Sequence, residues 1–261
     1  MNRSISTLTE NRRSAPARLL DIAKCARPVL FQNDDVGWPL SNGGTGFIVS
    51  FRNRHFVVTA KHVLRLQTFQ LGQFRVQYRP DLNQFLPLNA VPYDDPTTAE
   101  PDTDRFDVAV FRVDEPTLQV DLFGDYQPYI LHPCDRMTIF NPAAAYIYKG
   151  YPISERRLDF ENENDRNALM TGVTTRATYV GSTNFEGVRE LALLDLEPVQ
   201  DIDGMSGSPV FQVVNDPDGM HGNETFAGML IRGGLAARRA YFLEHSKIVG
   251  LLERMTARAD G

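Results

Sequence analysis

Short apolar segments rich in β-branched and aromatic residues recur along most of this chain, and they constrain its fold more than any other feature. GTGFIVSF (44–51) and HFVVTA (55–60) are separated by the polar residues RNR, which is the pattern of a β-hairpin. Polar or Pro- and Gly-rich stretches separate the other segments, and few of these stretches have helical periodicity. The sequence therefore predicts an all-β sandwich or barrel rather than alternating strands and helices. The other predicted strands are FRVQYRP (74–80), FDVAVFRV (106–113), YIYKGYP (146–152), VTTRATYV (173–180), LALLDL (191–196), SPVFQVV (208–214) and FAGMLIRGG (226–234).

One helix is predicted near the C-terminus. The apolar residues of KIVGLLERM (247–255) have the spacing of one face of an amphipathic helix. We expect this helix over residues 246–256, with Ser246 as its N-cap. Two acidic stretches, residues 93–106 and 158–167, are predicted to be solvated loops, because neither has the ligand spacing of an EF-hand calcium loop.

Composition and charge exclude several classes of protein. The chain has 261 residues and a formal net charge of -6, which argues against a general nucleic-acid binder. No apolar run is long enough to span a membrane, and Asp21 and Lys24 interrupt the apolar stretch that a secretory signal would need. Cys25 and Cys134 are too few for a disulfide framework. We therefore expect a cytoplasmic protein with neither a membrane nor a nucleic-acid partner.

Three polar residues near predicted strands could act together in catalysis. Ser206 lies in the glycine-bracketed turn DGMSGSPVF (203–211), His62 follows the strand HFVVTA, and Asp107 begins an otherwise apolar strand. A serine hydroxyl becomes a nucleophile when a base takes its proton and a third group orients that base. A partly buried carboxylate needs a partner, and a histidine N–H is a suitable one. Taken singly, each residue is more often structural, so the hypothesis depends on the combination.

The combination resembles a known family. TAKHV (59–63), FDVAVF (106–111) and GMSGSPVF (204–211) resemble, in order, the three catalytic blocks of the trypsin/chymotrypsin-like serine peptidases, in particular intracellular bacterial members. The order His, Asp, Ser differs from that of subtilisins and α/β-hydrolases. An α/β-hydrolase elbow also needs glycine where this chain has Ser208. The resemblance extends over residues 28–255, after an N-terminal arm formed by residues 1–27.

That resemblance implies a fold and a role for each residue. The expected fold has two packed six-stranded antiparallel β-barrels, the first over about residues 28–125 and the second over about 135–245, followed by the C-terminal helix. His62 would be the general base and then the general acid, Asp107 would orient it, and Ser206 would form the acyl-enzyme. The backbone N–H groups of Gly204 and Ser206 would form the oxyanion hole, and no cofactor or metal is implied.

The same resemblance implies where a substrate would bind. The segment FAGMLIRGG resembles the family's strand that pairs with the substrate backbone and borders the specificity pocket. A glutamine stands where trypsin has its pocket aspartate, so we expect cleavage after small, apolar or uncharged polar residues. Met205 replaces the acidic residue that pairs with a new N-terminus in secreted members, so we expect activity without N-terminal processing. The predicted substrate contacts are Gln200, Leu230, Ile231, Arg232 and Gly233.

The favoured hypothesis is an intracellular serine endopeptidase acting on proteins or peptides. One alternative is a protease effector subunit of a bacterial stress or defence system that a regulatory protein partner activates. A second alternative is a catalytically silent peptide-binding module. The basic arm over residues 1–27 is the sequence feature that fits docking to a partner.

Overall fold

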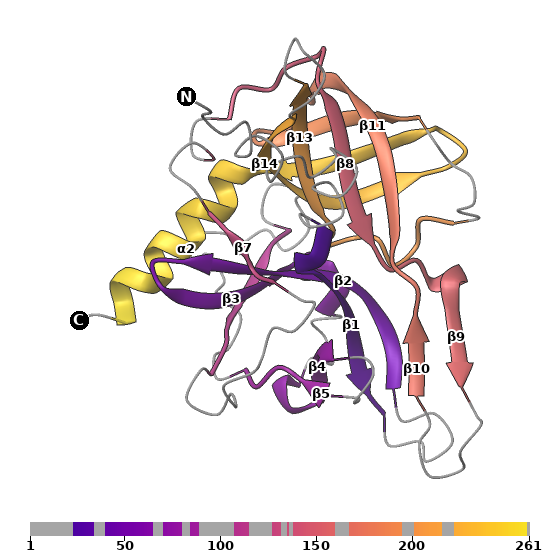
Figure 1. The fold of residues 1–261 in the computed structure, drawn as a ribbon, viewed down its shortest axis with the longest axis vertical. Coiled ribbons are helices and arrows are strands. Elements are labelled where there is room, and N and C mark those ends of the chain that lie inside the picture. The colour runs from indigo at the N-terminus through magenta and orange to yellow at the C-terminus, as the bar shows by residue number, and fades with distance from the viewer. Residues whose placement is uncertain are drawn as a thin grey trace, which may run out of the picture.

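Strands dominate the structure, a computed structural model. It describes residues 23–33, 40–64, 70–79, 84–88, 107–114, 127–131, 135, 138–159, 167–194, 201–215 and 222–259. Within these ranges the chain forms a barrel, a separate larger sheet and a C-terminal helix, as Figure 1 shows. The predicted all-β class is therefore confirmed for this part of the chain. Short 3-10 helices occur at Ala23–Cys25 (η1), Lys61–Leu64 (η2), Leu71–Gln73 (η3) and Ile153–Glu155 (η8).

The second half of the described chain closes into an antiparallel barrel, drawn in coral to yellow in Figure 1. Its strand order is β11-β12-β15-β14-β13-β8, so the chain's first barrel strand lies between β11 and β13 and completes the closure. This barrel lies in the region where the second barrel was predicted. The strands are β8 (Ala145–Gly150), β11 (Val173–Ser182), β12 (Val188–Leu193), β13 (Pro209–Asn215), β14 (Gly222–Gly234) and β15 (Arg239–Glu244).

The first half forms a seven-stranded sheet within the described residues, and no closure of this sheet is seen there. Its order is β5-β4-β1-β2-β3-β6, and β7 pairs with β2 in parallel. One of the two expected closed barrels is thus present, while the described residues of the other region show a sheet without a second closed barrel. The strands are β1 (Ala26–Gln32), β2 (Leu40–Phe51), β3 (Arg54–Thr59), β4 (Phe74–Arg79), β5 (Gln84–Phe85), β6 (Ala109–Arg112) and β7 (Tyr129–Ile130).

The predicted hairpin and the two predicted acidic loops had different outcomes. β2 and β3 pair up to Phe51↔Arg54, and Arg52 and Asn53 have φ of 49° and 60°, as a two-residue hairpin turn with two left-handed residues requires. The hairpin is therefore confirmed. The acidic stretch 158–167 was predicted as loop, but its ends belong to a two-stranded sheet of β9 (Arg156–Asp159) and β10 (Asn167–Met170). The other acidic stretch, 93–106, lies outside the described residues.

One apolar core joins the sheet to the barrel. Phe47 of β2 and Phe226 of β14 are both fully buried, and their ring centroids are 5.5 Å apart. Tyr129 of β7 packs edge-on against Phe211 of β13 at 5.1 Å. Each such aromatic removes a large apolar area from water, so the two β-structures are held as one packed unit. A second cluster fills the barrel interior.

The C-terminal helix, α2 (His245–Ala259), differs from its prediction at both ends. Its apolar face is buried as expected, with Ile248 and Leu252 at 0% exposure. The predicted N-cap is wrong, because the helix begins at His245 and Ser246 lies inside it. The Ser246 hydroxyl instead donates to Glu244 Oε1 at 2.6 Å. No helix within the described ranges is both long enough and apolar enough to cross a membrane.

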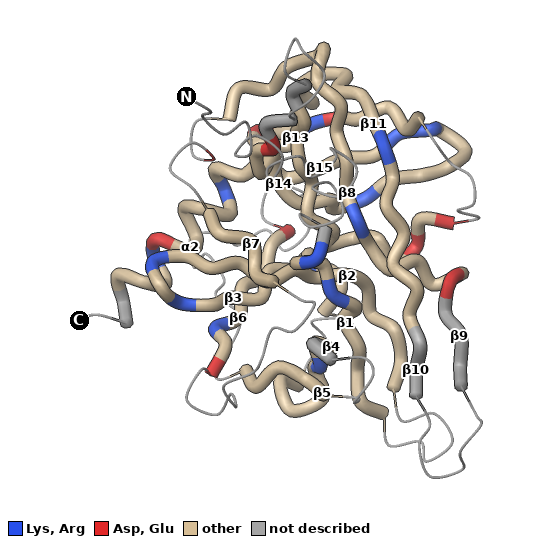
Figure 2. Tube along the Cα trace, viewed as in Figure 1, with Lys and Arg blue, Asp and Glu red and all other residues tan. Residues whose placement is uncertain are grey.

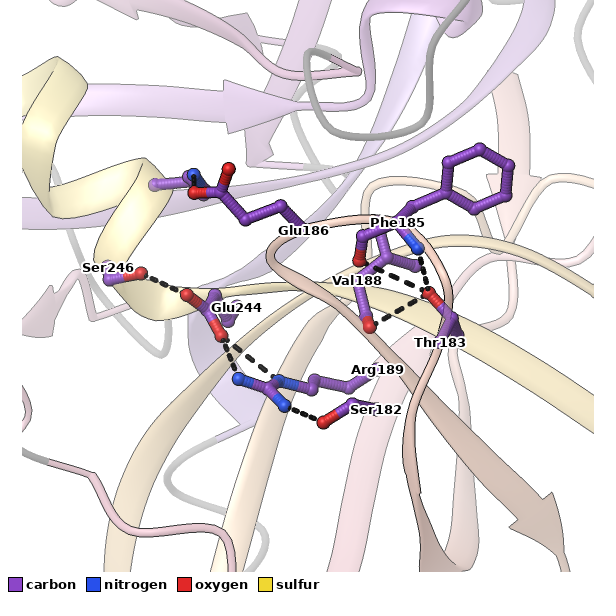
Figure 3. Close-up of polar contacts among 9 residues, drawn as sticks. Ser182, Thr183, Phe185, Glu186, Val188, Arg189, Glu244 and Ser246 are labelled. Carbon is purple, nitrogen blue, oxygen red and sulfur yellow. Dashed lines mark hydrogen bonds and ion pairs between the residues drawn. The ribbon is translucent and has the colours of Figure 1, made fainter.

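Charged residues are interspersed over the sheet, the barrel and α2 (Figure 2), and one partly buried ion pair links β12 to the end of β15, next to the start of the helix. Arg189 of β12 donates through Nη2 and Nε to Glu244 Oε2, at 2.7 and 3.0 Å (Figure 3). Its guanidinium also lies 4.9 Å from the centre of the Phe140 ring. Burial alone would raise the pKa of Glu244, but hydrogen bonds from Ser246 and Arg189 outweigh burial and lower it.

Replacing Glu244 with glutamine should destabilise the fold in a pH-dependent way. The folded-state pKa lies below the ordinary value of 4.5, so the carboxylate contributes stability above that value. The contribution is lost as the pH falls through the folded pKa. We expect Glu244→Gln to lower the free energy of unfolding by about 1–2 kcal/mol at pH 7 and by much less at pH 3.

Urea unfolding of both proteins at the two pH values measures this difference. Glu186→Gln is the matched control, because Glu186 pairs with Lys247 at 2.7 Å but its side chain is 76% exposed. That variant should change the free energy of unfolding by less than about 0.5 kcal/mol. Equal effects of the two substitutions would contradict the assignment of Glu244 as a partly buried, stabilising carboxylate.

Candidate active site

The register of β3 and β6 brings Asp107 to His62. These strands pair antiparallel with Thr59 opposite Ala109, so the residues just before Ala109 lie beside those just after Thr59. His62 belongs to η2, the 3-10 helix that begins two residues after β3 ends. Asp107 Oδ2 lies 2.6 Å from His62 Nδ1, and Asp107 Oδ1 accepts the backbone N–H of His62 at 2.9 Å. One carboxylate therefore fixes both the ring and the backbone of the histidine.

This contact determines how His62 can act. An ionised carboxylate can only accept hydrogen bonds, so His62 Nδ1 carries the proton that is shared with Asp107. The other ring nitrogen, Nε2, is then the unprotonated one in the neutral imidazole and can accept a proton. The His62 side chain is 53% exposed, whereas that of Asp107 is 14% exposed. The arrangement is that of a histidine whose ring is oriented by a carboxylate.

Ser206 lies on a turn that packs against the sheet close to η2. Its backbone carbonyl accepts the N–H of Thr45 of β2 at 3.0 Å, and its hydroxyl donates to the carbonyl of Ile231 at 3.0 Å. Gly44 bridges the two regions: a Cβ added there would lie 2.9 Å from Val63, the neighbour of His62, and 3.2 Å from the Ser206 carbonyl oxygen. The structure thus brings Asp107 into contact with His62 and places the Ser206 turn near the segment that carries His62, while the Ser206 hydroxyl itself bonds to Ile231.

Gly207 allows this close approach of the turn to β2. It has φ of 91°, and an added Cβ would lie 1.8 Å from the Thr45 carbonyl oxygen. Its N–H donates to the Leu230 carbonyl at 2.7 Å, so the residue is held from both sides. Only a residue without a side chain fits such a position without moving the backbone.

Gly207→Ala should therefore destabilise the protein by about 3 kcal/mol or more, through both the backbone strain and the clash with a carbonyl. Gly72→Ala is the control, because an added Cβ at Gly72 meets nothing within 4 Å. Thermal or urea unfolding measures both variants. A Gly207→Ala protein as stable as the Gly72→Ala protein would show that the turn does not pack as described.

Two N–H groups of the turn are open. Within residues 203–208, the backbone N–H groups of Gly204 and Ser206 have no hydrogen-bond acceptor in the part of the chain that the structure describes. Two unpaired donors separated by one residue, next to a serine hydroxyl, can receive a negatively charged oxygen. The other N–H groups of the turn are used: Asp203 donates to Asp201 Oδ1, Met205 to the Ile202 carbonyl, Gly207 to the Leu230 carbonyl and Ser208 to the Met205 carbonyl.

The predicted substrate contacts lie in different surroundings. The side chains of Leu230 and Ile231 are each 1% exposed and belong to the two core clusters, so only their backbones could meet a ligand. Arg232 and Gly233 are exposed, and the Arg232 guanidinium lies 4.5 Å from the centre of the Tyr241 ring. Gln200 lies outside the described residues. The role of these five positions in substrate binding stays a prediction.

Thr45 makes hydrogen bonds to two residues of the turn, and sequence reasoning did not find it. Its hydroxyl donates to the Gly204 carbonyl at 2.7 Å and accepts the N–H of Tyr151 at 2.9 Å. The contact with Gly204 joins residues 159 positions apart. No local pattern marks such a residue, because a threonine in a strand is ordinary and its partner is set by packing.

The described residues contain no group of three or more His, Cys, Asp or Glu side chains that could hold a metal ion. No protein-family model matches the chain, and no curated protein matches it in sequence. The argument for function therefore rests on the arrangement of His62, Asp107 and Ser206 and on the open amides beside the serine.

Proposed function

We propose that this chain is a serine endopeptidase of the trypsin/chymotrypsin type. The observation that carries the proposal is the double contact of Asp107 with His62, which leaves His62 Nε2 as a base at the junction that also holds Ser206. The closed barrel, the adjoining sheet and α2 are compatible with the two-barrel fold of that family. The substrate would be a peptide or protein, and the reaction needs no cofactor.

The chemistry follows from the positions of these groups. The Ser206 hydroxyl, which donates to Ile231 in the free protein, would turn its proton to His62 Nε2 and attack the peptide carbonyl carbon. The C–O bond forms, and the carbonyl electrons move to an oxyanion facing the N–H groups of Gly204 and Ser206. His62 then gives the proton to the leaving nitrogen as the C–N bond breaks. Water repeats the sequence to release the acyl group.

A fluorophosphonate probe tests the nucleophile directly. Ser206 Oγ should form a bond to phosphorus as fluoride leaves, and the hydroxyl proton should pass to His62. We expect labelling of the wild type at Ser206 by mass spectrometry, none in Ser206→Ala, and little in His62→Ala. Asp107→Asn should lower kcat on a cleavable peptide by about 10⁴, because the amide would favour the wrong imidazole tautomer.

The results separate the alternative functions. Labelling at another serine, or unchanged labelling of His62→Ala, would refute the assignment. A chain that binds peptides but is never labelled would be a binding module. A chain that is labelled only after a partner protein is added would be an effector subunit.

Met205 occupies the position that, in secreted members of this family, pairs with the N-terminus formed on activation. It is 0% exposed and lies in the apolar cluster of the barrel interior, with Leu230 and Ile202 among its neighbours. Burying an ammonium group against such a side chain would cost several kcal/mol without a compensating ion pair. An N-terminal amine freed by proteolysis therefore has no partner at this position.

We accordingly expect activity without N-terminal processing. The full-length chain and the same chain with an N-terminal tag should be labelled by the fluorophosphonate at the same rate. Intact mass should show an unprocessed N-terminus on the labelled species. Labelling that begins only after a cut near residue 27 would contradict this expectation, while leaving the catalytic assignment in place.

A further inference from the structure

The two open amides of the turn are oriented through the carbonyl groups on the other side of their peptide bonds. In a trans peptide the C=O of one residue and the N–H of the next point in opposite directions. The Asp203 carbonyl accepts the N–H of Ile153 at 2.8 Å, which turns the Gly204 N–H the other way. The Met205 carbonyl accepts both the N–H and the hydroxyl of Ser208, at 3.0 and 2.6 Å, which does the same for the Ser206 N–H.

Gly204 is the residue at which the backbone of the turn is least restricted. It has φ of 90° and lacks a Cβ, so its backbone has more accessible conformations than any other residue type. Fixing the peptide bond before Gly204 leaves the one after it able to rotate. That second peptide is held at both ends: the Thr45 hydroxyl donates to the Gly204 carbonyl at 2.7 Å, and the Met205 N–H donates to the Ile202 carbonyl at 3.0 Å.

The Thr45 hydroxyl has a defined direction. A hydroxyl carries one proton, and the oxygen of Thr45 accepts the Tyr151 N–H at 2.9 Å. That N–H occupies a lone pair, so the hydroxyl proton is available for the Gly204 carbonyl. Thr45 is 0% exposed, and its backbone N–H also holds the Ser206 carbonyl at 3.0 Å. One buried residue of the first sheet thus anchors the Gly204–Met205 and Ser206–Gly207 peptides, which directly follow the two peptides that carry the Gly204 and Ser206 N–H groups.

We propose that Thr45 is a positioning residue that holds the oxyanion-binding amides of Gly204 and Ser206 in the orientation needed for catalysis. This inference rests on the proposed serine-peptidase function. Met205 has no charge and cannot order the turn through an ion pair with an N-terminal amine. In our proposal the neutral hydrogen bond from Thr45 orders the turn instead. The turn should therefore be ordered before any substrate or partner binds.

The test compares fluorophosphonate labelling of Ser206 in three full-length proteins, with the maximal rate (kinact) separated from the half-saturating probe concentration (KI). Thr45→Val keeps the shape of the side chain and removes the hydroxyl, whereas Thr45→Ser keeps the hydroxyl. We expect Thr45→Val to lower kinact roughly 10- to 100-fold with KI unchanged, less than the loss of about 10²–10³ on removing an oxyanion donor. Thr45→Ser should stay within about threefold of the wild type.

Thr256→Val is the matched control for general destabilisation. Thr256 is 2% exposed and its hydroxyl donates to the Leu252 carbonyl at 3.0 Å in α2, away from the turn. We expect this variant to lose stability in urea while keeping the wild-type kinact. If Thr45→Val does not fold, Thr45→Ala and Thr45→Ser form a second pair, because both lose the methyl group and differ only in the hydroxyl.

The outcomes test the proposed function and the role of Thr45 separately. A wild type that is not labelled refutes the proposed function itself. A labelled wild type with an equally fast Thr45→Val refutes the role of Thr45 alone. A fall in kinact shared by Thr45→Ser or Thr256→Val, or a chain that folds only with a hydroxyl at position 45, shows a purely structural role and also overturns the inference.

Discussion

The close contact between β2 and the Ser206 turn is the constraint on which the site depends. Gly207 lies against the Thr45 carbonyl at a distance that excludes any side chain, and the Thr45 N–H and hydroxyl hold carbonyls of the turn. This contact crosses from the sheet to the barrel. The packing of the sheet against the barrel therefore determines where Ser206 lies.

The shared apolar core holds the sheet and the barrel in fixed relative positions and so maintains that contact. Rings from β2 and β7 pack against rings from β13 and β14, so neither β-structure can shift without opening a cavity. The turn itself contains few apolar side chains other than Met205, which anchors it in the barrel interior. Rigid apolar packing and directional hydrogen bonds together hold the backbone of the turn, and with it the N–H groups of Gly204 and Ser206, in one orientation.

The His62–Asp107 pair depends on a different part of the structure. It is set by the pairing of β3 with β6, and both residues lie just beyond the ends of their strands. Strand ends offer fixed backbones and side chains that are free to leave the sheet, which is why His62 can be both well oriented and half exposed. His62 and Ser206 are thus positioned by independent contacts, and the segments that carry them lie on either side of Gly44.

The sequence by itself determined the all-β class, the hairpin of β2 and β3, the buried face of α2 and the three candidate catalytic residues. These features are expressed locally, in the alternation of apolar residues, in turn residues and in short motifs. It placed the start of α2 one residue late, because Ser246 bonds to Glu244 instead of capping the helix. It also read the acidic stretch 158–167 as loop throughout, although backbone pairing places the ends of that stretch in strands β9 and β10. Only the tertiary structure decided that the barrel closes through β8, that Asp107 reaches His62, and that Thr45 holds Gly204. Those facts depend on pairing and packing between residues 23 to 159 positions apart, and a side chain carries no local signal of a partner so distant.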